Sequence, residues 1–261
     1  MTPRWLYLPA AAALAFLTLP LLGIPLRVAW ADLPALLTTP AALDALGLSL
    51  VTCLAATVVS VLLGLPLALL LARSDGPLAG VVRTLVTLPM VLPPVVAGLA
   101  LLITFGRRGT VGAPLSALGI EIGFTTLAVV LAQVFVAMPY LVTSVEGAVR
   151  TAGFARERVA ASLGASPTHT LLHVTVPVTA PALATGTALT FARALGEFGA
   201  TTTFAGALQG VTRTLPLEIY QVRELDTASA LALSLVLVAV AAVTVALTAW
   251  LSRRTPRRGV A

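Results

Sequence analysis

A run of 28 residues without any charged side chain, Ala45–Ala72, lies in the first third of this chain. A helix of that length crosses the hydrocarbon core of a bilayer with residues to spare for tilt. Similar runs recur further along, and 58% of the residues are hydrophobic whereas 10% are charged. The chain is therefore expected to be an all-α membrane protein rather than a soluble globular domain.

Six stretches are long and apolar enough to cross a membrane. They are Trp5–Leu26, Ala45–Ala72, Thr84–Gly106, Ile122–Val145 (broken by Pro139), a segment from near Pro181 to beyond Phe204, and Thr227–Ser252. The first could instead be a signal peptide cut after Ala31, but its apolar core exceeds the ~7–15 residues usual there, which favours a retained helix. We expect an N-terminal helix and loop (1–44), a main transmembrane domain (45–252) and a basic cytosolic tail (253–261).

The arginines predict the orientation. With six spans and both termini in the cytosol, ten arginines lie inside and five outside, and Arg193 lies within a span. Such an excess on the cytosolic side is the usual bias of membrane proteins. The same bias accounts for a pI near 11 without any binding of nucleic acid.

The segment Arg150–Pro177 is the polar exception, with four ionised side chains and both histidines between two long apolar segments. It is expected to form helix, break, helix, with the break at Gly164 and a helix restart at Ser166 and Pro167. Ala155, Val159 and Leu163 recur at helical spacing and predict one apolar stripe. Pro177, followed by Pro181, is expected to close the segment. This topology places it in the cytosol, where it is either a contact surface or a solvated connector with an interfacial helix.

The third and fifth spans carry features that are unfavourable in lipid. Pro89, Pro93 and Pro94 each remove a helix hydrogen bond, so this stretch is expected to face protein or a watery cavity, unless it is only a kinked packing helix. Arg193 and Glu197 stand at i, i+4 spacing and can pair on one helix face, either as functional groups or as a mutually neutralised pair. A small-residue stripe that permits close helix contact is formed by Ala188, Ala192, Gly196 and Ala200.

Motifs for chemistry are lacking in the sequence. A P-loop is impossible because the chain has no lysine. His169 and His173 stand at metal-ligand spacing, but no third ligand accompanies them, so no metal site is predicted. No set of nucleophile, base and acid can be assembled, and we predict no catalytic residues.

The spacing from Gly164 to Pro177 after a short alanine-rich helix resembles the cytosolic "EAA" loop of ABC importer permeases. The family's Glu-Ala-Ala positions are occupied here by Arg158, Val159 and Ala160, and the acidic Glu157 is displaced by one residue. The resemblance implies that the loop docks on an ATPase subunit. The residues that it assigns to this coupling are Arg158, Val159, Ala160, Gly164, Ala165, Ser166 and Pro177.

Three further runs resemble molybdate ABC permeases: residues 88–112 (LPMVLPPVVAGLALLITFGRRGTVG), 191–206 (FARALGEFGATTTFAG) and 212–220 (TRTLPLEIY). With the polar segment, the resemblance covers about residues 45–252. It implies the type I ABC importer permease fold in a bacterial or archaeal cell (inner) membrane, with the third and fifth spans lining the pathway. The candidate pathway residues are Pro89, Pro93, Pro94, Arg193, Glu197 and Thr201.

The family also implies an assembly of two copies of this chain, two cytosolic ABC ATPase subunits and an extracytoplasmic oxyanion-binding protein. ATP would be bound by the ATPase partner, and no cofactor by this chain. Molybdate import is expected, with tungstate or sulfate/thiosulfate as alternative substrates. A secondary transporter would need coupling-ion sites or inverted repeats, and a membrane enzyme would need a catalytic set; the sequence shows neither.

Overall fold

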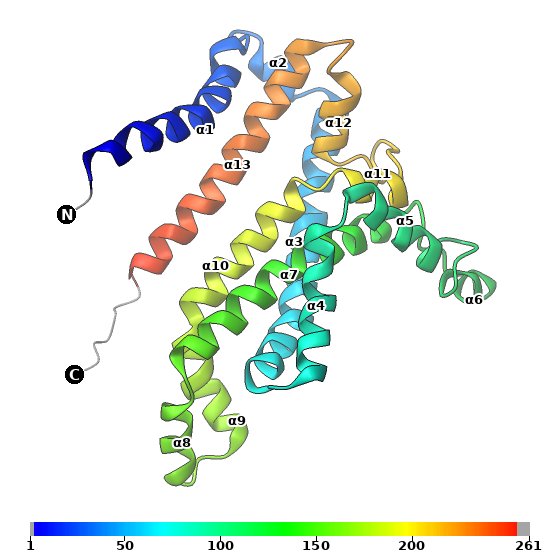
Figure 1. Cartoon of the computed structure of the whole chain (residues 1–261). Coiled ribbons are helices and arrows are strands. Elements are labelled where there is room, and N and C mark those ends of the chain that lie inside the picture. The colour runs from blue at the N-terminus through cyan, green and yellow to red at the C-terminus, as the bar shows by residue number, and fades with distance from the viewer. Residues whose placement is uncertain (1–2, 255–261) are drawn as a thin grey trace.

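The computed structural model describes residues 3–254, and every regular element in that range is a helix (Figure 1). A short 3₁₀ turn, Arg4–Leu6, leads into the first helix, and a π-helical turn, Leu171–Thr175, joins two others. The α-helices are α1 (Tyr7–Arg27), α2 (Leu33–Leu37), α3 (Pro40–Arg73), α4 (Pro77–Val91), α5 (Pro94–Phe105), α6 (Gly112–Ala117), α7 (Thr126–Ala152), α8 (Ala155–Ser162), α9 (Pro167–Thr170), α10 (Val176–Leu195), α11 (Gly199–Ala205), α12 (Leu215–Val222) and α13 (Thr227–Arg254).

Five helical stretches are long and apolar enough to cross a membrane, namely Arg4–Arg27, Pro40–Arg73, Thr126–Ala152, Pro167–Leu195 and Thr227–Thr248. A sixth crossing is available only if α4 and α5 are counted together, and these two helices are bent by 116° relative to each other. The predicted all-α membrane fold is confirmed. The third crossing, however, is a pair of helices and not one kinked helix.

α7 is the central helix and packs between α3 and α10 (Figure 1). Glycines allow the close approach on both sides. A Cβ added at Gly64 of α3 would lie 3.1 Å from the Met138 side chain, and one at Gly186 of α10 would lie 3.1 Å from Ser144 Cβ. Small residues at such crossings let the helix backbones approach closely. The resulting van der Waals packing drives helix association in lipid, where the hydrophobic driving force between helices is missing. Thr125 begins α7 by accepting a hydrogen bond from the Ala128 amide.

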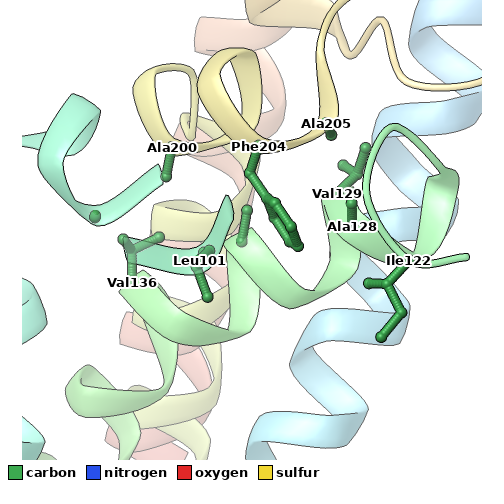
Figure 2. Packing of buried hydrophobic residues seen from close by; sticks show 10 residues of the cluster. Leu101, Ile122, Ala128, Val129, Val136, Ala200, Phe204 and Ala205 are labelled. Carbon is green, nitrogen blue, oxygen red and sulfur yellow. The ribbon is translucent and has the colours of Figure 1, made fainter. Parts of the chain in front are cut away.

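A second layer covers the first half of α7, where α5 and α11 pack against it (Figure 2). Phe204 of α11 is fully buried and points into the space between the three helices. The cluster consists of Ala97, Leu101, Ile122, Ala128, Val129, Ala132, Val136, Ala200, Phe204 and Ala205. This packing sets the direction of α5 after the bend.

The molecule has two distinct ends. The turn between α3 and α4 lies at the same end as α8 and α9, which project furthest from the bundle, while α2 and α12 lie at the opposite end (Figure 1). These are called the hairpin end and the α12 end below. α1 lies apart from the bundle, has no buried residue and packs mainly against α13.

Several predicted boundaries were wrong. The fourth crossing begins at Thr126, not Ile122, and α7 runs through Pro139 unbroken. Pro177 and Pro181 do not close the polar segment, because Pro177 occupies the first turn of α10 and Pro181 lies inside it. A proline is tolerated in a first turn, and the π-helical turn before it supplies the irregular hydrogen bonding that the missing N–H requires.

The expected division at residue 253 falls inside α13, which continues to Arg254. The rest of the predicted basic tail, residues 255–261, lies outside the described residues.

Candidate functional site

The chain breaks between α4 and α5 within the third crossing. α4 ends at Val91, where the Leu92 amide still reaches the Leu88 carbonyl at 3.1 Å. Pro93 then caps α5 and Pro94 occupies its first position, so neither proline needs an amide hydrogen there. Pro93 and Pro94 are exposed and the Val91 side chain is 82% exposed. Irregular backbone at membrane depth is tolerated only against protein or a water-filled cavity.

A second break separates α10 from α11, so the predicted fifth crossing is not one continuous helix past Phe204. The Glu197 side chain lies in this break and is 1% exposed. Its Oε2 pairs with Arg193 Nη1 at 2.7 Å, and its Oε1 accepts a hydrogen bond of 2.8 Å from the Ala200 amide. The predicted ion pair is present, and it joins the last turn of α10 to the first turn of α11.

The two breaks are neighbours because α5 and α11 pack very closely. A Cβ added at Gly199 would lie 2.4 Å from Pro94 Cβ. A Cβ added at Gly98 would lie 2.6 Å from Thr203 Cβ and 2.8 Å from the Ala200 carbonyl oxygen. The structure therefore brings the proline cluster and the charged break, far apart in the sequence, next to each other.

The remaining candidate pathway residues lie close to these breaks. Pro89 is half-buried inside α4. Thr201 of α11 is fully buried, and its hydroxyl has no hydrogen-bond partner among the described residues. The predicted small-residue stripe is not continuous: α10 ends at Leu195, so Gly196 is exposed in the break while Ala200 belongs to α11. Glycine, with its low helix propensity, and the capping carboxylate of Glu197 together favour ending the helix here.

At the hairpin end, α8 and α9 form the predicted helix, break, helix; residues 153–175 are called the hairpin. Gly164 has φ +83°, and the amides of Gly164 and Ala165 donate to the carbonyls of Ala161 and Ala160, both at 3.0 Å. This is the Schellman arrangement, which needs a left-handed residue. The Ser166 hydroxyl then accepts a hydrogen bond from the His169 amide at 3.3 Å and starts α9. Both local predictions are confirmed.

The hairpin is tied to the bundle through Glu157. Glu157 Oε1 accepts hydrogen bonds from Arg73 Nη2 at 2.8 Å and from the Thr175 hydroxyl at 2.6 Å. The Arg73 guanidinium also lies over the Phe154 ring, 5.7 Å from its centroid. One carboxylate thus links α8 to the end of α3 and to the π-helical turn.

A second cluster beside this link was missed by sequence reasoning. Arg83 and Arg150 both donate to the carbonyls of Leu71 and Ser74, where α3 ends, and both pair with Glu146 Oε1, at 2.5 and 3.2 Å. Cations at a helix C-terminus satisfy free carbonyls and favour the helix dipole. The signal in the sequence is the recurrence of charges at the ends of apolar runs, which predicts orientation but not these pairings.

Most of the predicted coupling residues lie on the outer surface of the hairpin. Arg158, Val159, Gly164 and Ser166 are exposed, while Ala160 and Ala165 are half-buried; Pro177, also exposed, lies beyond the hairpin in the first turn of α10. His169 and His173 stack at 4.1 Å between ring centroids, and the described residues hold no cluster of three or more His, Cys, Asp or Glu that could bind a metal ion.

The comparisons with known proteins identify the family and the fold. Residues 64–257 match the family described as "Binding-protein-dependent transport system inner membrane component". The "Molybdenum transport system permease protein ModB" of Mycobacterium tuberculosis is 58% identical over 230 residues, covering 88% of this chain and 87% of that protein. The "Sulfate transport system permease protein CysW" of Synechococcus elongatus is 34% identical over 216 residues, covering 82% and 76%.

Among solved structures, a bacterial alginate ABC transporter in complex with an alginate-bound periplasmic protein superposes with a TM-score of 0.69. The alignment covers 98% of this chain and 95% of that one at 19% identity. At this identity the likeness shows the fold alone, which is that of ABC importer permeases.

Proposed function

Because this chain belongs to the family of binding-protein-dependent transport system inner membrane components, we propose that it is the membrane-spanning subunit of an ATP-driven oxyanion importer, with molybdate as substrate. The assignment of molybdate as substrate rests on the 58% identity with ModB of Mycobacterium tuberculosis across nearly the whole of both chains. The chain is a transport permease and not an enzyme, and we assign ATP binding and hydrolysis to a separate subunit.

The hairpin supplies the contact for that subunit. It projects beyond the turn between α3 and α4, and Glu157 holds it against Arg73 and Thr175 (Figure 1). A movement imposed on α8 would therefore reach α3 through Arg73, and α10 through the π-helical turn. This requires the hairpin end to face the cytosol, with the N and C termini on the same side. An ATPase on each of two permease copies gives two ATPase subunits per importer.

The exposed break between α4 and α5 supports the second copy. Val91 is 82% exposed in the single chain, and the adjoining Pro93 and Pro94 are exposed with it. Since irregular backbone cannot face lipid, this surface needs a protein or aqueous neighbour. A homodimer in which the two copies face each other here provides both, with a pathway between them that opens alternately to either side.

The charged pair supports the assignment of substrate selection to the binding protein and not to the permease. Arg193 is already neutralised by Glu197 at 2.7 Å. The pair therefore presents no net positive charge to hold a dianion, and a permease must release its substrate. We assign oxyanion selection to an extracytoplasmic binding protein, so molybdate, tungstate, sulfate and thiosulfate are distinguished mainly there.

Reconstitution tests the proposal. The chain is co-purified from native membranes with its bound subunits, placed in proteoliposomes and supplied with the binding protein. We expect uptake of molybdate to require ATP and the ATPase subunit, and to be inhibited more strongly by tungstate than by sulfate. Uptake driven by an ion gradient without any ATPase would show a secondary transporter, and uptake of sulfate alone would move the chain to the sulfate importers.

A further inference from the structure

Of the three consecutive charged side chains on α8, only one has a partner within the described part of the chain. Glu157 turns toward the bundle, where Arg73 and Thr175 take up the same carboxylate oxygen at 2.8 and 2.6 Å. Arg156 and Arg158 are exposed, and neither side chain makes an ion pair or hydrogen bond with any residue in the described range. The outward surface of α8 therefore carries two free positive charges and no free negative charge.

An uncovered apolar surface accompanies these charges. Val159 of α8 is 59% exposed, and Leu163, the residue that follows α8, is 83% exposed, although both side chains are large and apolar. They line one shallow groove together with Ala155, Arg156, Ala160 and Val174. On the other side of α8, Arg158 borders a second concavity that also contains Arg73 and Thr170. The apolar stripe thus has a free arginine on each side.

We propose that the surface receiving this hairpin on the ATPase subunit is an apolar groove bordered by carboxylates, which pair with Arg156 and Arg158. This rests on the proposed function, in which an ATPase docks on the hairpin, and adds the chemistry of the partner's surface. The charges of the hairpin support this, because its one carboxylate already pairs with Arg73, and any carboxylate that pairs with Arg156 or Arg158 on docking belongs to the partner. Such pairs steer association and set specificity more than they add affinity.

An anionic membrane surface could in principle take up the same mixture of arginine and apolar side chains. The position of the hairpin favours a protein. α8 projects beyond the turn that closes α3 and α4, and Glu157 fixes it there (Figure 1). A helix that bound headgroups would lie level with the ends of the crossing helices.

The test compares charge reversals at two arginine pairs. The full-length chain in nanodiscs is titrated with the ATPase subunit that co-purifies with the wild type. R156E/R158E should raise the Kd about tenfold or more, because like charges then face each other, whereas R156K/R158K should stay close to wild type. The control is R107E/R108E, a second exposed arginine pair, in the loop between α5 and α6, of which Arg107 pairs with Glu121; it should not change the Kd. Raising the salt concentration should weaken wild-type binding and leave R156Q/R158Q unaffected.

Two further measurements separate the outcomes. V159S/L163S should weaken docking at every salt concentration. If it does so while R156E/R158E binds as the wild type does, the docking role stands and the carboxylate border is wrong. If no ATPase binds the wild type at all, the proposed function fails together with this inference. A fluorophore on Leu163→Cys, selective because Cys53 is buried, should respond to the ATPase. A response to anionic lipid instead would identify a membrane contact and overturn the proposal.

Discussion

Glu197 holds two elements together with one carboxylate. One oxygen pairs with Arg193 at the end of α10 and the other accepts the Ala200 amide at the start of α11, and the side chain is 1% exposed. A buried carboxylate without its cation is strongly unfavourable, whereas a neutral amide could still accept the Ala200 hydrogen bond. The residue is therefore both a counter-charge and a helix cap.

These two roles predict that two variants of the pair differ in stability. Arg193→Ala leaves the buried charge unpaired and should destabilise the protein by about 3–5 kcal/mol. R193A/E197Q removes the charge, keeps an acceptor for the Ala200 amide, and should recover most of that loss. Thermal unfolding and substrate-stimulated ATPase activity of the purified importer give the two readouts. Mild, additive effects of the single changes would indicate a water-exposed pair of little consequence.

At the residue scale the sequence predicted the ion pair but not the helix break in which it lies. The i, i+4 spacing of Arg193 and Glu197 indicated an ion pair, and it is present. The same spacing implied one helix face, yet the pair spans the break after Leu195. Where a helix ends depends on the hydrogen bonds that the residues after it make outside the helix. Here Glu197 lies in the break and accepts the Ala200 amide at the start of α11, which spacing alone does not reveal.

At the scale of elements, α5 and α11 form the tightest contact in the region of the breaks. Gly98 lies against the Ala200 backbone and Gly199 lies against Pro94, with no room for a methyl group at either position. The three prolines predicted lost hydrogen bonds but not the 116° bend, because the angle follows from the packing of α5 on α11 and α7.

This contact predicts opposite results for two glycine substitutions. Gly98→Ala should push α5 away from α11, destabilising the protein by about 1–3 kcal/mol as overpacking does, and should impair transport. The control is Gly147→Ala on α7, where a Cβ meets nothing within 4 Å; it should be neutral or stabilising, since alanine favours helix. Thermal unfolding of both variants is compared. Equal stability would show that α5 can move freely relative to α11.

Gly164 predicts an effect confined to the hairpin. Its φ of +83° disfavours a residue with a Cβ, although no neighbouring atom lies within 4 Å of the added carbon. Gly164→Val should therefore leave the chain inserted and the bundle unchanged, but alter the angle between α8 and α9 and weaken association with the ATPase. Membrane insertion and ATPase co-purification are measured together. Wild-type association and transport in this variant would contradict the coupling role of the hairpin.

At the scale of the whole molecule, arginines are paired at both ends, and among the described residues the hairpin end adds two that are unpaired. Arg213 and Arg223, toward the α12 end, pair with Glu218 and Glu224. Arg156 and Arg158 at the hairpin end are unpaired within the described part of the chain. The long apolar runs were enough to predict the crossings, because burial in lipid dominates their energetics. The docking of α5 on α11 involves glycine contacts between distant segments, which no local pattern encodes.

The excess of arginine at the hairpin end predicts that this end is cytosolic, because cytosolic loops carry more Lys and Arg than external loops. Thr168→Cys in α9 and Gln221→Cys in α12 place exposed thiols toward opposite ends, and neither side chain is used in a cap or ion pair. The native Cys53 is buried and gives a low background. In right-side-out vesicles a membrane-impermeant maleimide should label Gln221→Cys directly, and Thr168→Cys only after permeabilisation. Direct labelling of Thr168→Cys would invert the topology, and the hairpin could then no longer meet a cytosolic ATPase.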